Sequence, residues 1–273
     1  MSGAPFMLEE MNARQLRKMT NSKTVALLVF GACENHGDHM PFGSDCYVPL
    51  ELAKQVAYHA ENVLLLPAFP YGVSSHHSDF QMTIALEAAT LVRAIENICS
   101  SLIKNGIKRI LIINGHDGNI APIESSARIL KDRYPDVVIA CLEAWWDVIS
   151  EVRKGLFDEW SGLGHGGEAE TSAMLHVRPD LVNMNYAPRK TIPKLPDNLR
   201  IYWKFKELTN TGATGAPRKA TRSKGKEVLK ALERLLLAFI NEMDKNDWKY
   251  GLAKKSEAAR GQDKHSIKSN YRY

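Results

Sequence analysis

Four short, continuous apolar runs divide the first half of this 273-residue chain. They are residues 24–31 (TVALLVFG), 63–67 (VLLLP), 109–114 (RILIIN) and 137–143 (VVIACLE). Runs of branched apolar residues without polar alternation are typical of strands that are buried on both faces of a parallel sheet. Helical patterns lie between them at residues 47–60, 87–105 and 121–134. This alternation predicts an α/β fold, a three-layer α/β/α sandwich with a mostly parallel central sheet.

The second half of the chain is less regular. Residues 187–222 carry several prolines and glycines, which predicts an irregular excursion near the active site or at a subunit interface. Residues 224–244 form an amphipathic helix whose apolar stripe serves the core or a subunit contact. We expect one domain over residues 1–248, followed by a basic, flexible tail over residues 249–273.

Charge and cysteine usage narrow the class of protein. The net charge is +5, and the tail alone, with seven Lys or Arg against two acids, accounts for all of it. The body is therefore near neutral, which argues against a nucleic-acid partner. The chain has no apolar run of the roughly 18 to 20 residues that a membrane span needs, and acids stand at its start where a signal peptide would be basic. With four scattered cysteines and no CxxC pair, we expect a cytoplasmic protein without disulfides or a membrane anchor.

Three polar clusters, each placed after an apolar run, carry the candidate chemistry. They span residues 31–45 (GACENHGDHMPFGSD), 114–119 (NGHDGN) and 164–172 (GHGGEAETS). Their nitrogen and oxygen side chains suit a divalent ion such as zinc, manganese or iron. The candidate ligands are Glu34, His36, Asp45, His116, Glu168 and Glu170. Singly, each could be a turn residue or a helix cap; together, at strand ends where α/β sheets bind ligands, they predict a metal-dependent hydrolase.

The same clusters resemble the motifs of a known family. The run ENHGDHMPFGSD resembles the E-x-H-G-x-H-L-P-x-x-T-D signature of the creatinine amidohydrolase (creatininase) family, and NGHDGN and HGGEAETS resemble its NGHGGN and HAGxxETS motifs in the same order. The resemblance spans roughly residues 20–245. It implies a three-layer subunit, usually assembled as a homohexamer, with two divalent ions per subunit. It also implies that Glu34 and His116 hold one ion, that His36 holds the other, and that Asp45 bridges them.

Departures from the family pattern bear on the second ion and on the substrate. Creatininase has a glutamate at the position of Gly118, so Glu170, or failing it Glu168, is expected to complete the second ion site. Creatininase also has a tyrosine at the position of Asp117 and tryptophans around its ring pocket, of which only Trp146 has a match here. Creatinine is therefore not the expected substrate. Expected substrate contacts are Asp117, His39, Ser74, His77 and Trp146.

The expected reaction is hydrolysis of a C–N bond in a small polar amide, cyclic amide or formamide. Two ions would lower the pKa of a bridging water to give hydroxide near neutral pH. His165, beside the metals and able to titrate near pH 7, is the candidate that protonates the leaving nitrogen, and Glu170 supports the same centre. Three alternatives stay open: ring opening of an oxidised cyclitol, peptide cleavage as in one branch of the family, and a non-catalytic metal-binding scaffold.

Overall fold

A four-stranded parallel sheet forms the centre of the computed structural model, which describes residues 6–196 and 199–251. The strands are β1 (Val25–Phe30), β2 (Val63–Leu65), β3 (Arg109–Asn114) and β4 (Val138–Leu142). They pair in the order β2-β1-β3-β4, with Val25 opposite both Val63 and Arg109. All three pairings are parallel, and each strand falls within a predicted apolar run.

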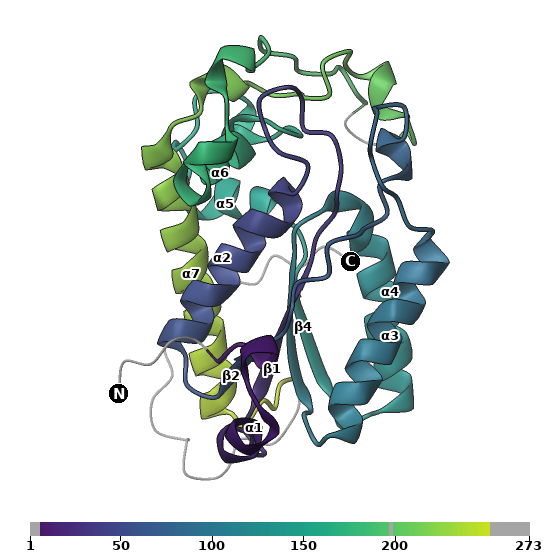
Figure 1. Ribbon diagram of the computed structural model, residues 1–273, viewed down its shortest axis with the longest axis vertical. Coiled ribbons are helices and arrows are strands. Elements are labelled where there is room, and N and C mark those ends of the chain that lie inside the picture. Colours follow the sequence, from purple (N-terminus) through teal and green to yellow (C-terminus); the bar gives the residue numbers. More distant parts are fainter. Residues whose placement is uncertain (1–5, 197–198, 252–273) are drawn as a thin grey trace.

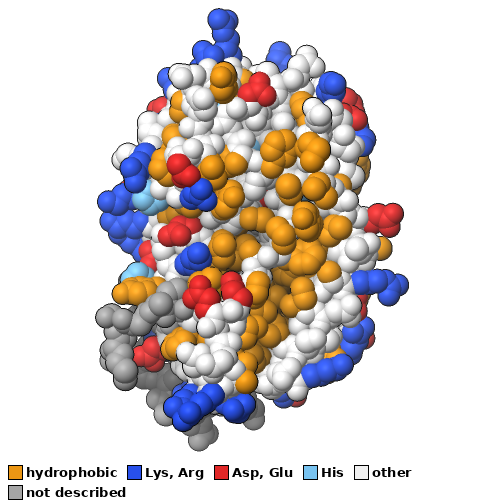
Figure 2. Space-filling model, viewed as in Figure 1, with side chains coloured by type: hydrophobic (Ala, Val, Ile, Leu, Met, Phe, Trp, Pro, Cys, Tyr) orange, Lys and Arg blue, Asp and Glu red, His pale blue; other side chains and the backbone are white. Residues whose placement is uncertain are grey.

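Helices cover both faces of the sheet, which confirms the three-layer α/β/α sandwich (Figure 1). One face carries α2 (Ser44–His59), α5 (Trp145–Val152), α6 (Glu168–Val177) and α7 (Arg222–Lys245). The opposite face carries α3 (Ala88–Lys104) and α4 (Ile120–Arg133). A short helix, α1 (Ala13–Met19), precedes the first strand. On the face viewed in Figure 2, apolar side chains gather along the middle and charged side chains lie mostly around the rim.

Alternate residues of β1 point into two separate cores. Leu27 and Val29 pack with α2, α5, α6 and α7, while Leu28 and Phe30 pack with α3 and α4. All six residues of β1 are buried. A strand covered on both faces has no position for a polar side chain, which explains why its sequence is an unbroken apolar run.

Glycines at the ends of β1 and β3 let the start of α2 sit directly on the sheet. A Cβ atom on Gly115 would lie 1.9 Å from the main-chain oxygen of Asp45, and one on Gly31 would lie 2.6 Å from the same oxygen. These glycines admit the first turn of α2, which brings Asp45 over the carboxyl ends of both strands.

The structure corrects several local expectations. Helix α2 begins at Ser44, three residues earlier than predicted, so Asp45 lies in its first turn. Helices α1 and α5 were not predicted because elements of seven and eight residues show little periodicity. The third polar cluster follows a 3-10 turn (Trp160–Gly162) and opens α6; it does not follow a strand.

Residues 187–221 are irregular apart from short 3-10 turns, as predicted. Within the described ranges no helix combines the length and apolarity that a membrane crossing demands. Most of the predicted tail, residues 252–273, lies outside the described residues.

Candidate metal centre

Ionisable side chains from three parts of the chain meet at the carboxyl ends of β1 and β3. There are three overlapping groups, and within each group the ligand atoms all lie within 4.8 Å of one another. The groups are Glu34, Asp45 and His116; His36, Asp45 and Glu170; and Glu34, His36 and His165. Asp45 is common to the first two, so its carboxylate stands between two neighbouring sets of ligands. This is the arrangement that a carboxylate shared by two ions requires.

Main-chain carbonyls fix the ring nitrogens of two of these histidines. His36 donates from Nδ1 to the carbonyl oxygen of Glu34 (3.1 Å), which turns its Nε2 to Asp45 Oδ1 at 3.0 Å. His116 donates from Nε2 to the carbonyl oxygen of Val73 (3.0 Å), and its Nδ1 lies 3.1 Å from Glu34 Oε1. A carbonyl can only accept a hydrogen bond, so the nitrogen on the other side of each neutral ring offers a lone pair to the carboxylates.

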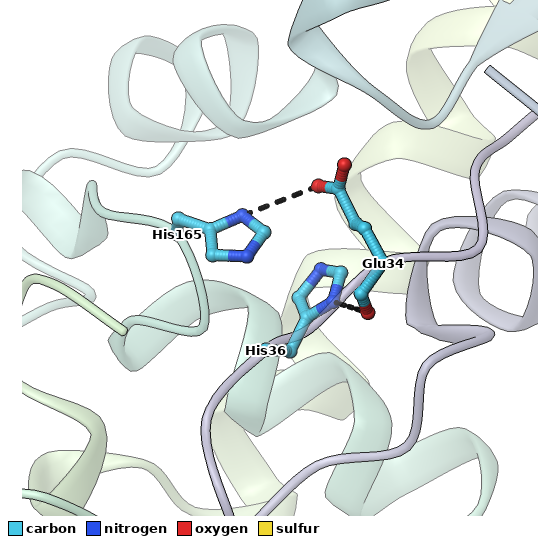
Figure 3. A group of neighbouring side chains, drawn as sticks. All are labelled: Glu34, His36 and His165. Atoms are coloured by element: carbon cyan, nitrogen blue, oxygen red, sulfur yellow. Dashed lines mark hydrogen bonds and ion pairs between the residues drawn. The ribbon is translucent and has the colours of Figure 1, made fainter. Parts of the chain in front are cut away.

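His165 follows the same rule. Its Nε2 donates to the carbonyl oxygen of Asn35 at 2.6 Å. Its Nδ1 faces Glu34 Oε1 at 3.6 Å (Figure 3). Three imidazole lone pairs therefore point toward a common group of carboxylate oxygens. Metal-binding histidines are commonly held in this way, by a hydrogen bond from the nitrogen that does not bind the ion.

Three oxygens of these carboxylates accept no hydrogen bond from the described part of the chain, although histidine rings lie close to them. Both side-chain oxygens of Glu34 and Oδ2 of Asp45 are buried without a hydrogen bond among the described residues. Buried polar atoms are nearly always satisfied, and a bare buried charge is costly. Oxygen and nitrogen atoms left open toward one point are a donor set that suits a divalent cation, so the residues present fit the metal that the sequence predicted.

The electric field at this point favours positive charge. Burial opposes the charged form of His36, but Asp45, Glu170 and Glu34 outweigh it and raise the pKa of His36 to about 10. The pKa of His116 is likewise raised, against its burial, chiefly by Glu34. The pKa of Asp45 is lowered despite burial, because His36 and His116 surround it. The centre therefore attracts a cation, either a proton or a metal ion.

Glu170, and not Glu168, faces this centre. Burial raises the pKa of Glu170 to about 7, and one of its oxygens accepts from the amide of Gly166 at 2.6 Å. Gly118 explains why the acid comes from α6. A Cβ atom there would lie 2.0 Å from the carbonyl oxygen of Val73 and 2.6 Å from His116 Nε2, so this backbone has no room for a glutamate.

Glu168, the second choice for the same role, is used elsewhere. Its carboxylate lies 2.6 Å from Lys224 Nζ of α7 and accepts from the amides of Asp158 and Glu159. It belongs to none of the ligand groups found in the described part of the chain. Its position corrects the sequence expectation and gives Glu168 a structural role at the start of α6.

The environment of His165 differs from the one that the sequence suggested. Burial, together with the nearby His36, lowers the pKa of His165 to about 4, against the attraction of Glu34. The ring is therefore neutral at pH 7 and does not titrate there. Because Nε2 donates its hydrogen to the carbonyl oxygen of Asn35, Nδ1 of the neutral ring carries no proton. Nδ1 must therefore accept a proton before it can donate one.

A cavity of about 310 Å³ lies in front of these ligands. Of the expected substrate contacts, Asp117, His77 and Trp146 line it. Ser74 and His39 do not: Ser74 is buried behind His116, with its Oγ 3.4 Å from His116 Nε2, and His39 donates from Nε2 to Thr171 Oγ1 at 3.0 Å. These two residues support the walls of the site and do not face its interior.

Aromatic residues that the sequence reasoning missed complete the wall. They are Trp160, Trp203 and Phe205. The expectation of a pocket with few tryptophans is therefore wrong. Trp203 and Phe205 come from the irregular excursion that was expected near the active site, but nothing in its sequence indicates which of its side chains point inward.

Known proteins are similar to this chain over much of its length. Residues 9–240 match the Creatininase family model, described as creatinine amidohydrolase. A creatinine amidohydrolase of Pseudomonas putida is 32% identical over 177 residues, which is 59% of this chain and 67% of that protein. The mycofactocin precursor peptide peptidase of Mycobacterium tuberculosis (strain H37Rv) is 24% identical over 235 residues, which is 82% of this chain and 87% of that protein.

Two solved structures of creatininase superpose on the fold. A manganese form and a zinc–zinc form of a mutant are each 26% identical, each with a TM-score of 0.75. They cover 87% and 88% of this chain, respectively, and 98% of their own chains.

Proposed function

Because the chain belongs to the creatininase family, we propose that this hydrolase uses two divalent ions to cleave a C–N bond in a small polar amide, cyclic amide or formamide. The supporting observation is the convergence of open nitrogen and oxygen atoms around Asp45. Zinc or manganese suits this donor set, and creatininase has been solved with each. Iron has the same ligand preference.

The proposed ligands divide around Asp45. Glu34 and His116 would hold one ion, His36 and Glu170 the other, and Asp45 would contact both. When bound, such ions lower the pKa of water and polarise a substrate carbonyl. The intact set of ligands favours a catalyst over a non-catalytic scaffold, because folding alone gives no reason to bury two carboxylates with unpaired oxygens.

His165 is the proposed proton carrier. Its neutral Nδ1 faces the centre and can accept a proton from the attacking water, after which the imidazolium can give that proton to the leaving nitrogen. The rings of His77 and Phe205 pack at centroid distances of 4.2 Å and 4.9 Å from His165. They limit the access of bulk water to the ring and keep it in one orientation.

The decisive experiment removes the shared carboxylate. In Asp45→Ala we expect elemental analysis to find both ions lost and hydrolysis of formamides and cyclic amides to fall at least 100-fold. Asp38→Ala is the matched control, because Asp38 lies seven residues earlier on the same segment and is exposed. An Asp45→Ala protein that keeps both ions would refute the shared-carboxylate arrangement, and a metal-loaded wild type inert toward every amide would refute the hydrolase.

Peptide cleavage is the second candidate. The match to the mycobacterial peptidase extends over more of this chain than the match to the Pseudomonas enzyme. An assay of metal-loaded protein against short peptides beside the small amides separates the two. Peptide products without amide turnover would favour the peptidase.

A further inference from the structure

A second cavity, of about 630 Å³, adjoins the one at the candidate metal centre. The two cavities share four lining residues, His76, Asp117, Leu195 and Trp203. A ligand that rests on these residues can therefore extend into both. The inner cavity contains the metal-type ligands, whereas the outer cavity contains none of them.

The wall of the outer cavity is unusually apolar for a surface exposed to water. Leu199, Ile201 and Tyr202 line it, with 76%, 53% and 88% of their surfaces exposed. Large apolar side chains that gather on an exposed wall commonly mark a place where a ligand binds. The charged groups nearby offset each other, because Arg200 lies 3.6 Å from the carboxylate of Asp117.

Trp203 stands at the junction and is held there by other rings. Its centroid lies 5.7 Å from the ring of His76 and 5.7 Å from that of Phe205. His76 in turn stacks on His116, with centroids 5.5 Å apart and planes within 10° of parallel, and Phe205 packs 4.2 Å from His77. A continuous set of aromatic contacts thus connects Trp203 to a proposed metal ligand.

The neighbouring lysine anchors the same stretch of chain. Lys204 Nζ donates to the carbonyl oxygen of Ser75 (2.7 Å) and to Ser78 Oγ (2.8 Å). The backbone beside Trp203 is therefore fixed to the turn that carries His76. A ring held in this way offers a flat surface without the entropy cost of ordering a mobile side chain.

We propose that the natural substrate has two parts, an amide that reaches the metal centre and a flat aromatic group that occupies the outer cavity against Trp203. This inference rests on the proposed amidohydrolase function. A cavity of 310 Å³ is at the lower end of typical ligand sites, and the adjoining 630 Å³ provides room for a much larger molecule than a simple amide. Offset stacking on an indole is favourable for flat rings in general, so the surface selects for shape and apolarity.

The test uses two pairs of substrates that differ only in the aromatic group. They are N-methylformamide with N-benzylformamide, and acetamide with phenylacetamide. For metal-loaded wild type we expect kcat/KM to be at least tenfold higher for the aromatic member of at least one pair. Trp203→Ala should lower kcat/KM for the aromatic member at least fivefold more than for the small member and so remove that advantage, while Trp203→Phe should retain most of it. Tyr58→Ala is the control, since Tyr58 is half exposed on α2 and lines neither cavity.

The outcomes separate this inference from the function on which it rests. Equal kcat/KM within both pairs, or an equal loss on both members in Trp203→Ala, would overturn the two-part substrate and leave the hydrolase standing. If neither pair is hydrolysed, the amidohydrolase proposal is weakened, and calorimetry with N-benzylacetamide decides the outer site. Binding at least tenfold weaker in Trp203→Ala than in wild type supports it; equal affinity overturns it.

Discussion

At the scale of single residues, the centre depends on which nitrogen of each histidine is already engaged. Carbonyl oxygens of Glu34, Val73 and Asn35 occupy one nitrogen each of His36, His116 and His165. The other nitrogen of each ring faces Glu34 or Asp45. The main chain therefore prepares the ligands before any ion binds, which reduces the reorganisation that binding requires.

Metal binding should release protons. Without an ion, the pKa of His36 is raised to about 10, so the ring holds a proton at pH 7 that a metal ion must displace. Apparent metal affinity should therefore rise as the pH rises toward 10 and fall in acid. Calorimetric titration at pH 7 in two buffers of different ionisation enthalpy should show at least one proton released per chain. An observed heat that does not depend on the buffer would contradict the proposed state of His36.

Creatinine should be a poor substrate. Asp117 lines the inner cavity and calls for a substrate with hydrogen-bond donors, and the junction at Trp203 favours an extended molecule over a compact ring. We expect kcat/KM for creatinine to be at least 100-fold below that of the best amide found in a screen at equal concentrations. Efficient creatinine hydrolysis would show that the tryptophans of the cavity bind a small ring. It would contradict the substrate preference but not the proposed metal centre.

At the scale of elements, one partly buried ion pair fixes the start of α6 against α7. Lys224 Nζ contacts both Glu168 and Asp158, and the amides of residues 158 and 159 point to the same Glu168 carboxylate. The backbones of the two helices also touch closely, since a Cβ atom on Gly225 would lie 1.9 Å from the carbonyl oxygen of Ser172. The loop that carries His165 is thus positioned from α7.

Loss of this pair should be costly. Lys224→Met keeps the length of the side chain but leaves the fully buried Glu168 without its cation, and breaking such a pair lowers the free energy of unfolding by about 3–5 kcal/mol. Lys226→Met, on the exposed side of the same helix turn, should change it by less than about 0.5 kcal/mol. Urea unfolding followed by circular dichroism measures both. A difference between the variants below about 1 kcal/mol would mean that the pair contributes little.

At the scale of the whole molecule, the candidate metal centre lies at one edge of the sheet, where the strands end and the irregular excursion lines the cavity. The basic tail holds none of the proposed ligands and no amphipathic pattern. Removal of residues 254–273 should therefore leave metal content and turnover within about twofold of the full chain, with any effect limited to assembly. Light scattering measures the mass of both proteins, for which the family resemblance predicts a homo-oligomer. Lost metal at unchanged mass would show that the tail contributes to an active site.

The sequence by itself determined the layers and most of the centre. Short continuous apolar runs rich in branched residues are typical of strands covered on both faces, and parallel strands place their carboxyl ends at one edge, so the residues after β1 and β3 were expected to meet. Glu34, His36, Asp45 and His116 could be named for that reason.

Only the tertiary structure decided between Glu168 and Glu170. Two residues apart on a helix, they point about 200° apart around its axis, so one faces the centre and the other faces away. Both glutamates lie in the same short stretch of sequence. Which of them faces the centre depends on Lys224, which is more than fifty residues away and forms an ion pair with Glu168. The cavity wall was equally hidden, because Trp203 and Phe205 lie in a segment without periodicity, where long-range packing alone sets the direction of each side chain.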